Sequence, residues 1–368
     1  MSDWASADHV LCVRLDAMGD VLMTTPAIRA LKESRPGRRI TLLTSPSGAA
    51  VAAMIPEVDD VLVYESPWMK STAPGPDGRA DLAMIGRLRG EGFDAAAIFT
   101  VYSQSPLPAA LMCHLADIPL RLAHCRENPY QLLTDRVPEA DPGPGPGVRH
   151  EARRQLDLVA AVGATTGDER LSLRVPEESR ARVPAILRRA GVDPDRPWVV
   201  VHPGATAPSR RYPPEGFAAA ARELATEHGV RVVFTGDASE AGLVDSIRAA
   251  MGAPSASMAG RLGLADFAAL VERAPVLISN NTGPVHVAAA VGTPVVDLYA
   301  LTNLQHTPWM VPHRVLFHDV PCKPCYKSDC PLGHHDCLRL VPPGAVARAA
   351  RELIAGGRAA PVPDFTFA

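Results

Sequence analysis

A chain of 368 residues that is 47% hydrophobic and 21% charged, with a formal net charge of -3, is typical of a globular protein of two domains. The nearly neutral balance gives no reason to expect a nucleic-acid partner, and the N-terminal residues do not have the basic and apolar pattern of a signal peptide. The longest apolar run, residues 285–298, contains Gly292, Thr293 and Pro294 and is too short to cross a bilayer, so we expect a cytoplasmic protein.

The first half of the chain alternates strand and helix patterns. Residues 10–15 (VLCVRL) predict a strand, residues 16–20 a turn, residues 21–34 a helix and residues 40–44 a second strand. Such a βαβ unit implies a parallel sheet that is covered by helices. Further strands are predicted at 60–64, 95–100 and 120–123, and helices at 80–91 and 107–115.

A stretch rich in proline and glycine follows the last of these strands. Residues 138–147 (PEADPGPGPG) cannot form a helix or a central strand, and we expect a loop near the end of the first domain. A helix is predicted at 149–163. The residues from there to about Pro197 are predicted to be a linker.

The second half repeats the alternation. Residues 198–201 (WVVV) predict a strand, which a long loop at 202–213 follows. Helices are predicted at 214–228, 239–251, 264–273 and 343–355, with a strand at 231–235 and a short segment at 257–259. We therefore expect an α/β protein with an N-terminal domain at 1–165, a C-terminal domain at 166–342 and a C-terminal helix and tail at 343–368.

The stretch from Val276 to Leu298 (VLISNNTGPVHVAAAVGTPVVDL) organises the second half. It predicts a strand at 276–279, a polar turn at 280–283, a short helix from Pro284 to Gly292 and a strand at 294–298. A helix N-terminus after such a turn has unpaired backbone N–H groups, and its dipole favours a phosphate or diphosphate. Thr282 offers a hydroxyl and His286 a ring N–H to the same anion. The alternative is an ordinary turn with Thr282 as the helix cap and His286 as a surface histidine.

Ligands of open α/β sheets bind beyond the carboxyl ends of the strands, where both halves have glycine-containing loops. Candidate residues in these loops are Gly19, Gly204, Ala205 and Thr206. Asp20 begins a helix, and its carboxylate could remove a proton from an attacking hydroxyl group. The alternative is that Asp20 is the N-cap of this helix, a role for which Asp is well suited. Two such domains that face each other would enclose a cleft for the ligand.

Charged residues in the second half add to this site. Arg210 and Arg211 lie in the loop after a strand and could bind a phosphate, or they could be an ordinary solvated pair. Glu240 follows a Gly-Asp turn and could accept hydrogen bonds from a ribose. It could equally complement the dipole of the helix that it begins.

Four of the seven cysteines lie close together in the sequence: Cys322, Cys325, Cys330 and Cys337, spaced C-x2-C-x4-C-x6-C. Disulfides are not expected in a chain without a secretion signal. Four thiolates at this spacing can bind a structural zinc or iron ion, and His334 or His335 could replace one of them. The alternative is four reduced thiols in a proline-rich loop.

Six arginines could meet an acidic acceptor or a membrane surface, or could belong to ordinary solvated faces. They are Arg35, Arg38, Arg39, Arg149, Arg153 and Arg154.

Several segments together resemble one family, the ADP-heptose:lipopolysaccharide heptosyltransferases of glycosyltransferase family nine. They are residues 10–45 (VLCVRLDAMGDVLMTTPAIRALKESRPGRRITLLTS), 199–225 (VVVHPGATAPSRRYPPEGFAAAARELA) and 279–302 (SNNTGPVHVAAAVGTPVVDLYALT). Residues 321–338 (PCKPCYKSDCPLGHHDCL) are similar to a cysteine-rich segment of many members. The matches come in order and cover most of residues 10–340.

The resemblance implies a GT-B fold, in which two Rossmann-like doubly wound domains face each other across a cleft. It implies inverting transfer of a heptose from an ADP-sugar on the second domain to a lipid-linked or other saccharide acceptor on the first, with no cofactor for catalysis. By position, Asp20 matches the family's catalytic base, and Arg210 matches a lysine that holds the diphosphate. Glu240 matches the acid that binds the ribose, and Leu262 matches a residue whose backbone lies at the adenine. The loop that binds the diphosphate and the sugar is matched by Thr282, Gly283 and His286. A lipid-linked acceptor would add a peripheral contact with the inner membrane.

One departure concerns Asn281, where the family usually has Asp. An amide keeps a hydrogen bond to a sugar hydroxyl but carries no negative charge, so the departure bears on the sugar more than on the phosphates. Transfer from another nucleotide sugar, or to a non-lipid acceptor such as a secondary metabolite or a protein, therefore stays open. A non-catalytic nucleotide-binding module is the alternative of a different class.

Overall fold

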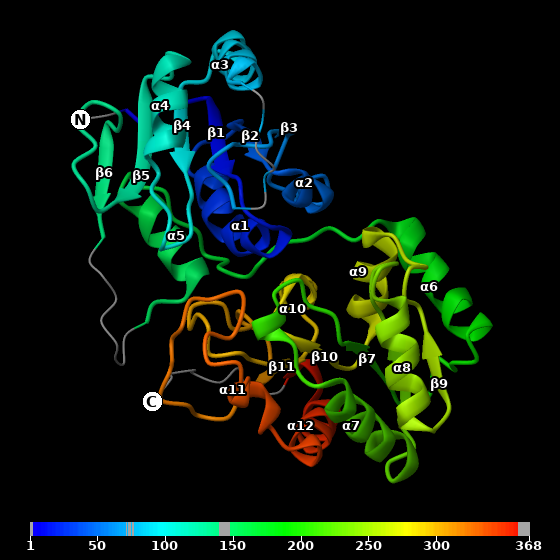
Figure 1. The fold of residues 1–368 in the computed structure, drawn as a ribbon. Helices are drawn as coiled ribbons and strands as arrows, with labels where there is room; N and C mark the ends of the chain where they lie inside the picture. Colours follow the sequence, from blue (N-terminus) through cyan, green and yellow to red (C-terminus); the bar gives the residue numbers. More distant parts are fainter. Residues whose placement is uncertain (1–2, 71, 73–74, 76, 140–147, 360–368) are drawn as a thin grey trace. The chain divides into compact units, whose positions relative to one another are not determined.

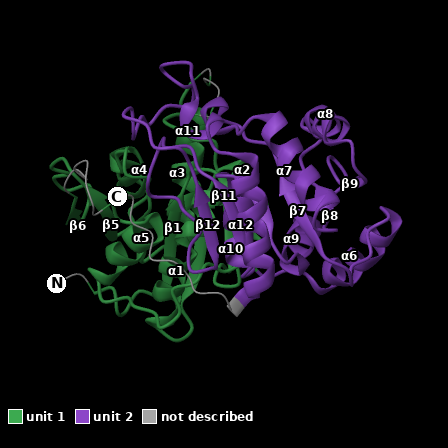
Figure 2. Ribbon diagram, turned by 90° about the horizontal axis from the view of Figure 1, so that it is seen from below, with its two compact units in different colours: residues 1–173 green, residues 174–368 purple. Residues whose placement is uncertain are grey.

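The computed structural model describes residues 3–359 except 71, 73–74, 76 and 140–147. The predicted loop at 138–147 and the tail after residue 359 thus lie largely outside the described residues. The chain divides into two compact units, residues 1–173 and 174–368, which Figure 2 colours separately. Within the described part of the chain, no helix is both long enough and apolar enough to cross a membrane.

Unit 1 is built on a six-stranded parallel sheet (Figure 1). In chain order its strands are β1 (His9–Arg14), β2 (Arg39–Thr44), β3 (Asp60–Val63), β4 (Ala95–Ile98), β5 (Leu120–Cys125) and β6 (Asp135–Pro138). They lie in the order β3-β2-β1-β4-β5-β6. This is the Rossmann order, in which the direction of winding reverses between β1 and β4. Loops that leave the carboxyl ends of these two strands diverge and leave room for a ligand.

Helices cover both faces of this sheet. They are α1 (Met18–Glu33), α2 (Pro46–Ala52), α3 (Arg79–Glu91), α4 (Leu107–Leu115) and α5 (Glu151–Ala160). The apolar residues of α3 and α4 pack on β1 and β4 in one buried cluster, while α1 packs against α2 and α5. α5 therefore brings a helix N-terminus from late in the unit next to the helix that follows β1.

Unit 2 repeats this topology. Its strands are β7 (Trp198–His202), β8 (Arg231–Phe234), β9 (Ser255–Ser257), β10 (Leu277–Asn280), β11 (Val295–Leu298) and β12 (His313–Leu316), all parallel in the order β12-β11-β10-β7-β8-β9. The reversal here lies between β7 and β10. The prediction of two doubly wound α/β domains is therefore confirmed.

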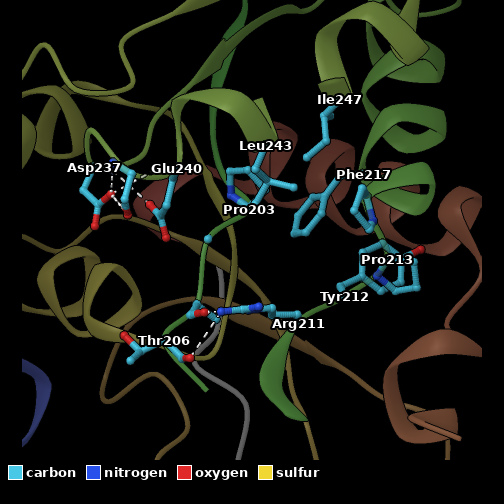
Figure 3. A pocket seen from close by; sticks show the side chains of 14 residues that line it. Pro203, Thr206, Arg211, Tyr212, Pro213, Phe217, Asp237, Glu240, Leu243 and Ile247 are labelled. Atoms are coloured by element: carbon cyan, nitrogen blue, oxygen red, sulfur yellow. Dashed lines mark hydrogen bonds between the residues drawn. The ribbon is translucent and has the colours of Figure 1, made fainter. Parts of the chain in front are cut away.

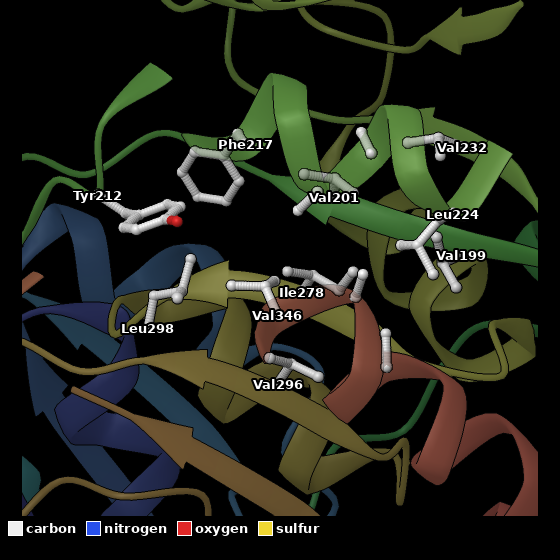
Figure 4. Close-up of a cluster of buried hydrophobic side chains, with 14 of the residues drawn as sticks. Val199, Val201, Tyr212, Phe217, Leu224, Val232, Ile278, Val296, Leu298 and Val346 are labelled. Atoms are coloured by element: carbon white, nitrogen blue, oxygen red, sulfur yellow. The ribbon is translucent and has the colours of Figure 1, made fainter. Parts of the chain in front are cut away.

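The helices of unit 2 enclose its apolar core. They are α6 (Glu177–Arg189), α7 (Pro214–Thr226), α8 (Ala241–Met251), α9 (Leu264–Arg273), α10 (Gly283–Ala290), α11 (Asp336–Arg339) and α12 (Pro343–Gly356). Valines of β7 and β8 pack on Phe217 and Leu224 of α7 and on Val346 of α12 (Figure 4). The continuous apolar run of β7 is what burial on both faces of a parallel sheet requires.

The sequence patterns do not predict α2, β6, α6 or β12. α6 occupies the segment that we predicted to be a linker, so that prediction is wrong. The helix contains Pro184 and buries only three side chains, which weakens its apolar pattern. Tertiary contacts stabilise it instead, because Arg180 and Arg182 form ion pairs with Glu272 and Asp266 of α9.

Other boundaries shift by a few residues. β9 spans 255–257 rather than 257–259, and α5 begins at Glu151 rather than at residue 149. Pro138 belongs to β6, which is an edge strand, the place in a sheet where proline is tolerated.

Candidate active site

Asp20 lies in the first turn of α1, directly after the strand at which unit 1 reverses its winding. The helix begins at Met18, three residues earlier than predicted, and its N-cap is Ala17. The interpretation of Asp20 as the N-cap is therefore wrong. As the third helical residue, next to the buried Gly19, Asp20 places a carboxylate where the positive end of the helix dipole favours it.

A buried arginine at the end of β1 holds three carboxylates. Arg14 Nε lies 3.0 Å from Asp16 Oδ2, its Nη2 lies 3.3 Å from Asp20 Oδ1, and its Nη1 lies 3.1 Å from Glu151 Oε1. The side chains of Arg14 and Glu151 are fully buried, whereas that of Asp20 is 18% exposed. Asp20 is thus the acid of this cluster that is most open to a solute.

Burial and crowding change the protonation of the cluster. Burial raises the pKa of Asp16 to about 6, and the nearby carboxylates of Asp20 and Glu151 act in the same direction, while Arg14 opposes them. Gln104, from the loop after β4, donates a hydrogen bond of 2.7 Å to Asp16. Burial alone would lower the pKa of Arg14, but its three carboxylate partners raise it, so the guanidinium stays charged.

Sequence reasoning missed Arg14, Asp16 and Glu151 as members of the site. An arginine inside an otherwise apolar strand was the available signal, because a buried strand tolerates a charge only if partners lie close. Glu151 had no such signal, since it lies 137 residues from Arg14 in the chain.

The six arginines considered as a surface for acidic partners have partners within unit 1. Arg35, Arg39 and Arg153 pair with Asp8, Asp60 and Glu169, and Arg149 pairs with Glu139 and Asp157. Arg38 and Arg154 are buried, so a solvated face is the wrong interpretation for these two. Arg38 donates to backbone carbonyls and Arg154 binds Glu139. The side chains of Arg35, Arg39, Arg149 and Arg153 stay partly exposed despite these ion pairs.

In unit 2 a cavity of about 650 Å³ opens between the loop after β7, the N-terminus of α7 and α8 (Figure 3). Phe217, Leu243 and Ile247 form its apolar part, and Asp237 and Glu240 lie on its polar side. Four predicted donor residues, Gly204, Ala205, Thr206 and Glu240, also line it. Apolar walls with a few placed polar groups are typical of small-molecule sites.

Glu240 is the residue that precedes α8, and its carboxylate reaches back to the end of β7. Its Oε2 accepts a hydrogen bond from the Asp237 amide at 2.9 Å, and burial raises its pKa. A Cβ atom on Gly204 would lie 1.7 Å from Glu240 Oε1, so a larger residue there would displace the Glu240 carboxylate. Burial lowers the pKa of the neighbouring His202 to about 4, so this histidine is neutral.

Leu262 follows β9 and is half-buried. Its loop contacts the loop after β8, because the Gly260 amide donates to the Gly236 carbonyl at 3.0 Å and the Gly260 Cα lies close to Ala238. The structure therefore brings the backbone at Leu262 and the turn before Glu240 to neighbouring positions at one end of the sheet.

The adjacent arginines in the loop after β7 have different environments. Arg211 Nε donates to the Ala205 carbonyl at 2.8 Å and Nη2 to the Thr206 carbonyl at 3.3 Å, so this side chain closes its own loop. Arg210 lies within electrostatic reach of Asp297 on β11. Among the described residues, no ion pair or side-chain hydrogen bond engages the Arg210 guanidinium.

The turn from β10 to α10 keeps two amides open. The Asn281 amide donates to the Leu298 carbonyl at 3.2 Å, but within the described chain the amides of Thr282 and Gly283 have no acceptor. Thr282 occupies the N-cap position without capping, since its hydroxyl donates to the Asn280 carbonyl at 3.3 Å. His286 is buried, so the interpretation as a surface histidine is wrong. Two free amides at a helix N-terminus form an anion site.

The four cysteines of the 322–337 segment lie near one another. Burial raises the pKa of Cys337, and the other three thiols raise it further. Burial also acts to raise the pKa of Cys330, but hydrogen bonds from the amides of residues 332–335 outweigh it and lower that pKa. Amides that surround a thiolate are typical of metal-binding turns, so this donor set fits a metal. In the described residues, no three of these thiols and imidazoles lie within 4.8 Å of one another.

Two doubly wound units, each with its candidate residues at the reversal of winding, form the architecture of the GT-B glycosyltransferases. Residues 82–335 match the model of the family described as Glycosyltransferase family 9 (heptosyltransferase). The chain belongs to this family and is a glycosyltransferase, as the resemblance predicted.

Known proteins of similar sequence and structure agree. The lipopolysaccharide heptosyltransferase 2 of Escherichia coli K12 is 25% identical over 360 residues, which cover 94% of this chain and 98% of that protein. Among solved structures, a glycosyl transferase family 9 protein from Veillonella parvula has a TM-score of 0.77 at 20% identity, covering 95% of this chain and 98% of its own. The E. coli heptosyltransferase WaaC with ADP-2-deoxy-2-fluoro heptose has a TM-score of 0.64 at 18% identity, covering 94% of this chain and 99% of its own. These likenesses confirm the GT-B fold.

A further structural neighbour contains iron. The iron-containing dodecameric heptosyltransferase TibC, solved in complex with ADP-D-beta-D-heptose, has a TM-score of 0.52 at 13% identity and covers 95% of this chain and 77% of its own.

Proposed function

We propose that the protein transfers a heptose from ADP-heptose to a lipopolysaccharide-core or related saccharide, with inversion and without a catalytic metal. The observation that carries the proposal is the turn before α10, where the amides of Thr282 and Gly283, and the nearby guanidinium of Arg210, have no partner among the described residues and can meet a diphosphate. Family membership and the ADP-sugars in the structures of WaaC and TibC support this donor. A lipid-linked acceptor would bring the protein to the inner face of the membrane.

In the proposed reaction, Asp20 removes the proton from an acceptor hydroxyl, whose oxygen attacks the anomeric carbon of the donor. The bond from this carbon to the β-phosphate oxygen breaks, and ADP leaves with the electron pair. The amides of Thr282 and Gly283 and the guanidinium of Arg210 stabilise the charge that develops on the diphosphate. Arg14 Nη2 lies 3.3 Å from Asp20 Oδ1 and holds the carboxylate in position.

The remaining candidates complete the proposed donor site. Glu240 accepts hydrogen bonds from the ribose, and the backbone at Leu262 contacts the adenine. Thr206 and His286 add a hydroxyl and a ring N–H to the phosphate end, while Gly204 and Ala205 let the loop approach the donor closely.

Incubation of the purified protein with ADP-heptose and a core oligosaccharide tests the proposal. We expect release of ADP that depends on the acceptor, and no release from UDP- or GDP-sugars. Binding of ADP-heptose without transfer to any saccharide would contradict the acceptor class. Transfer from a different nucleotide sugar at a higher kcat/KM would contradict the donor.

The two neighbouring arginines provide a matched pair of variants. Arg210→Ala is expected to weaken ADP binding by roughly tenfold or more, because it removes a charge-assisted hydrogen bond to the diphosphate. Arg211→Ala is expected to change ADP affinity much less, since its guanidinium binds carbonyls of its own loop. Isothermal titration calorimetry with ADP measures both. Equal losses in the two variants would contradict the assignment of Arg210 to the diphosphate.

We also propose that Cys322, Cys325, Cys330 and Cys337 bind a structural zinc or iron ion. When bound, the ion would tie together a loop that has little apolar core of its own. The chain's contribution is the set of thiolates and the amides that surround Cys330.

Metal analysis tests this site. The purified protein is expected to contain about one zinc or iron ion per chain, and Cys330→Ser and Cys337→Ser almost none. Lys327→Ala, in the same loop, should keep the metal. A metal content of the unaltered protein far below one ion per chain, measured by mass spectrometry, would contradict the site.

A further inference from the structure

The side chain of Asn281 is held by two acceptors inside unit 2. Its Nδ2 donates to Asp297 Oδ2 at 2.8 Å and to the His306 carbonyl at 2.8 Å. Asp297 lies on β11, next to the strand that leads into the Asn281 turn, and is fully buried. Both N–H groups of the amide are therefore used within the protein.

The chemistry of these partners fixes the orientation of the amide. A backbone carbonyl only accepts hydrogen bonds, so a flipped amide would set its oxygen against the His306 carbonyl oxygen. The Oδ1 atom of Asn281 is left over, and no hydrogen bond among the described residues uses it. Asn281 can therefore present only an acceptor to a ligand.

The neighbouring strand supplies the carboxyl group that the amide lacks, at Asp297. Burial raises the pKa of Asp297 well above its ordinary value, and the hydrogen bond from Asn281 and the charge of Arg210 oppose this rise. Asp297 Oδ1 is buried without a hydrogen-bond partner in the described part of the chain. Tyr299 lies close enough for Asp297 to affect its pKa, and burial is the larger cause of the rise in that pKa. Asn281 and Arg210 are thus the groups that stabilise this carboxylate.

We propose that Asp297 is a positioning residue that fixes Asn281 so that its Oδ1 accepts a hydrogen bond from a hydroxyl of the donor sugar. The inference rests on the proposed function, because it assumes that the sugar lies at the turn before Thr282 and Gly283. It deepens that function by naming the substrate class. A neutral acceptor at this place fits a sugar hydroxyl and gives no ion pair to an amino sugar.

Exchange of the two residues tests the pairing. Asn281→Asp sets a second carboxylate beside Asp297, and two buried carboxylates at this distance share a proton. The pKa of the pair is raised above its unfolded value, so stability is present at low pH and is lost as the pH rises. We expect the thermal midpoint of this variant to fall below that of the unaltered protein by an amount that grows from about pH 5 to pH 8.

The double variant N281D/D297N has one carboxylate at position 281 and one amide at position 297, so the pair again has one acceptor and one donor. Its thermal midpoint should return most of the way to that of the unaltered protein, and the added pH dependence should disappear. Recovery is not expected to be complete, because the His306 carbonyl loses its donor. Asp245→Asn, an exposed residue of unit 2, is the control for loss of one charge and should match the unaltered protein. An N281D variant with the pH profile of the unaltered protein would overturn the pairing.

Kinetics and binding test the contact with the sugar. At about pH 8, we expect N281D to have a kcat/KM for ADP-heptose about tenfold lower than that of the unaltered protein. The double variant N281D/D297N is expected to regain at least half of this loss in log(kcat/KM). The affinity for ADP alone should change less than kcat/KM does, because ADP lacks the transferred sugar whose hydroxyl would bind at Oδ1. A double variant no better than N281D in kcat/KM would overturn the positioning role. If the unaltered protein bound no ADP, the proposed function would fail, while the stability results would still report on the pair.

Discussion

Replacement of Asp20 by Asn is expected to lower kcat for sugar transfer by about 10³-fold or more, because an amide cannot take the proton of the acceptor hydroxyl. The substitution keeps the size of the side chain and an oxygen that can face Arg14. It lies in unit 1, far in sequence from the donor residues of unit 2, so the affinity for ADP should not change. Release of ADP at saturating donor and acceptor measures kcat, and calorimetry measures ADP binding.

A control and a pH profile sharpen this result. Asp117→Asn removes one negative charge from the surface of unit 1, where Asp117 is exposed, and should leave kcat unchanged. If Asp20→Asn retained more than about a tenth of kcat, the loss would be too small for a general base, whose removal typically costs 10²- to 10⁴-fold. Asp20 would then be a binding residue, and the proposed mechanism would need another base.

The sequence predicts those parts of the fold that local patterns determine. β1, β7 and β10 are short apolar runs, and each is followed by a glycine-containing turn and a helix. Burial on both faces of a parallel sheet produces such runs, so the strands could be read from composition alone. β12, with only His313 fully buried, and α6, with a proline inside, lack these local signals and depend on their neighbours.

The same distinction applies to the candidate site. Asp20 and the Thr282 turn lie on recognisable segments, because a helix N-terminus has a local sequence pattern. The partners of these residues do not lie on segments with such a pattern. Glu151 meets Arg14 only through the packing of α5 on α1, and Asp297 meets Asn281 only because β11 pairs with β10. The sequence therefore indicates which residues could act, but not which residues hold them.

Arg14 offers the prediction with the largest expected effect on stability. Arg14→Met keeps much of the volume of the side chain but removes the cation that three carboxylates share. Loss of one partner from a buried ion pair typically costs about 3–5 kcal/mol, because the remaining charges stay buried without compensation. We expect a loss of this size in the free energy of unfolding of unit 1 at neutral pH, measured by urea denaturation followed by hydrogen exchange of α1 and α5.

The pH dependence distinguishes electrostatic from packing loss. In the unaltered protein the pKa of Asp16 is already raised to about 6, so the folded state binds its proton more tightly than the unfolded chain does, and this contribution to stability is lost as the pH rises through that value. Without Arg14 the pKa of Asp16 should rise further, so the deficit of Arg14→Met should shrink toward low pH. Addition of Glu151→Gln should recover part of the deficit at neutral pH, because it removes one buried charge that has lost Arg14 and keeps the longer ion pair with Arg154 Nη1, at 3.5 Å. A deficit that was constant with pH and unchanged by Glu151→Gln would mean that Arg14 stabilises unit 1 by packing alone.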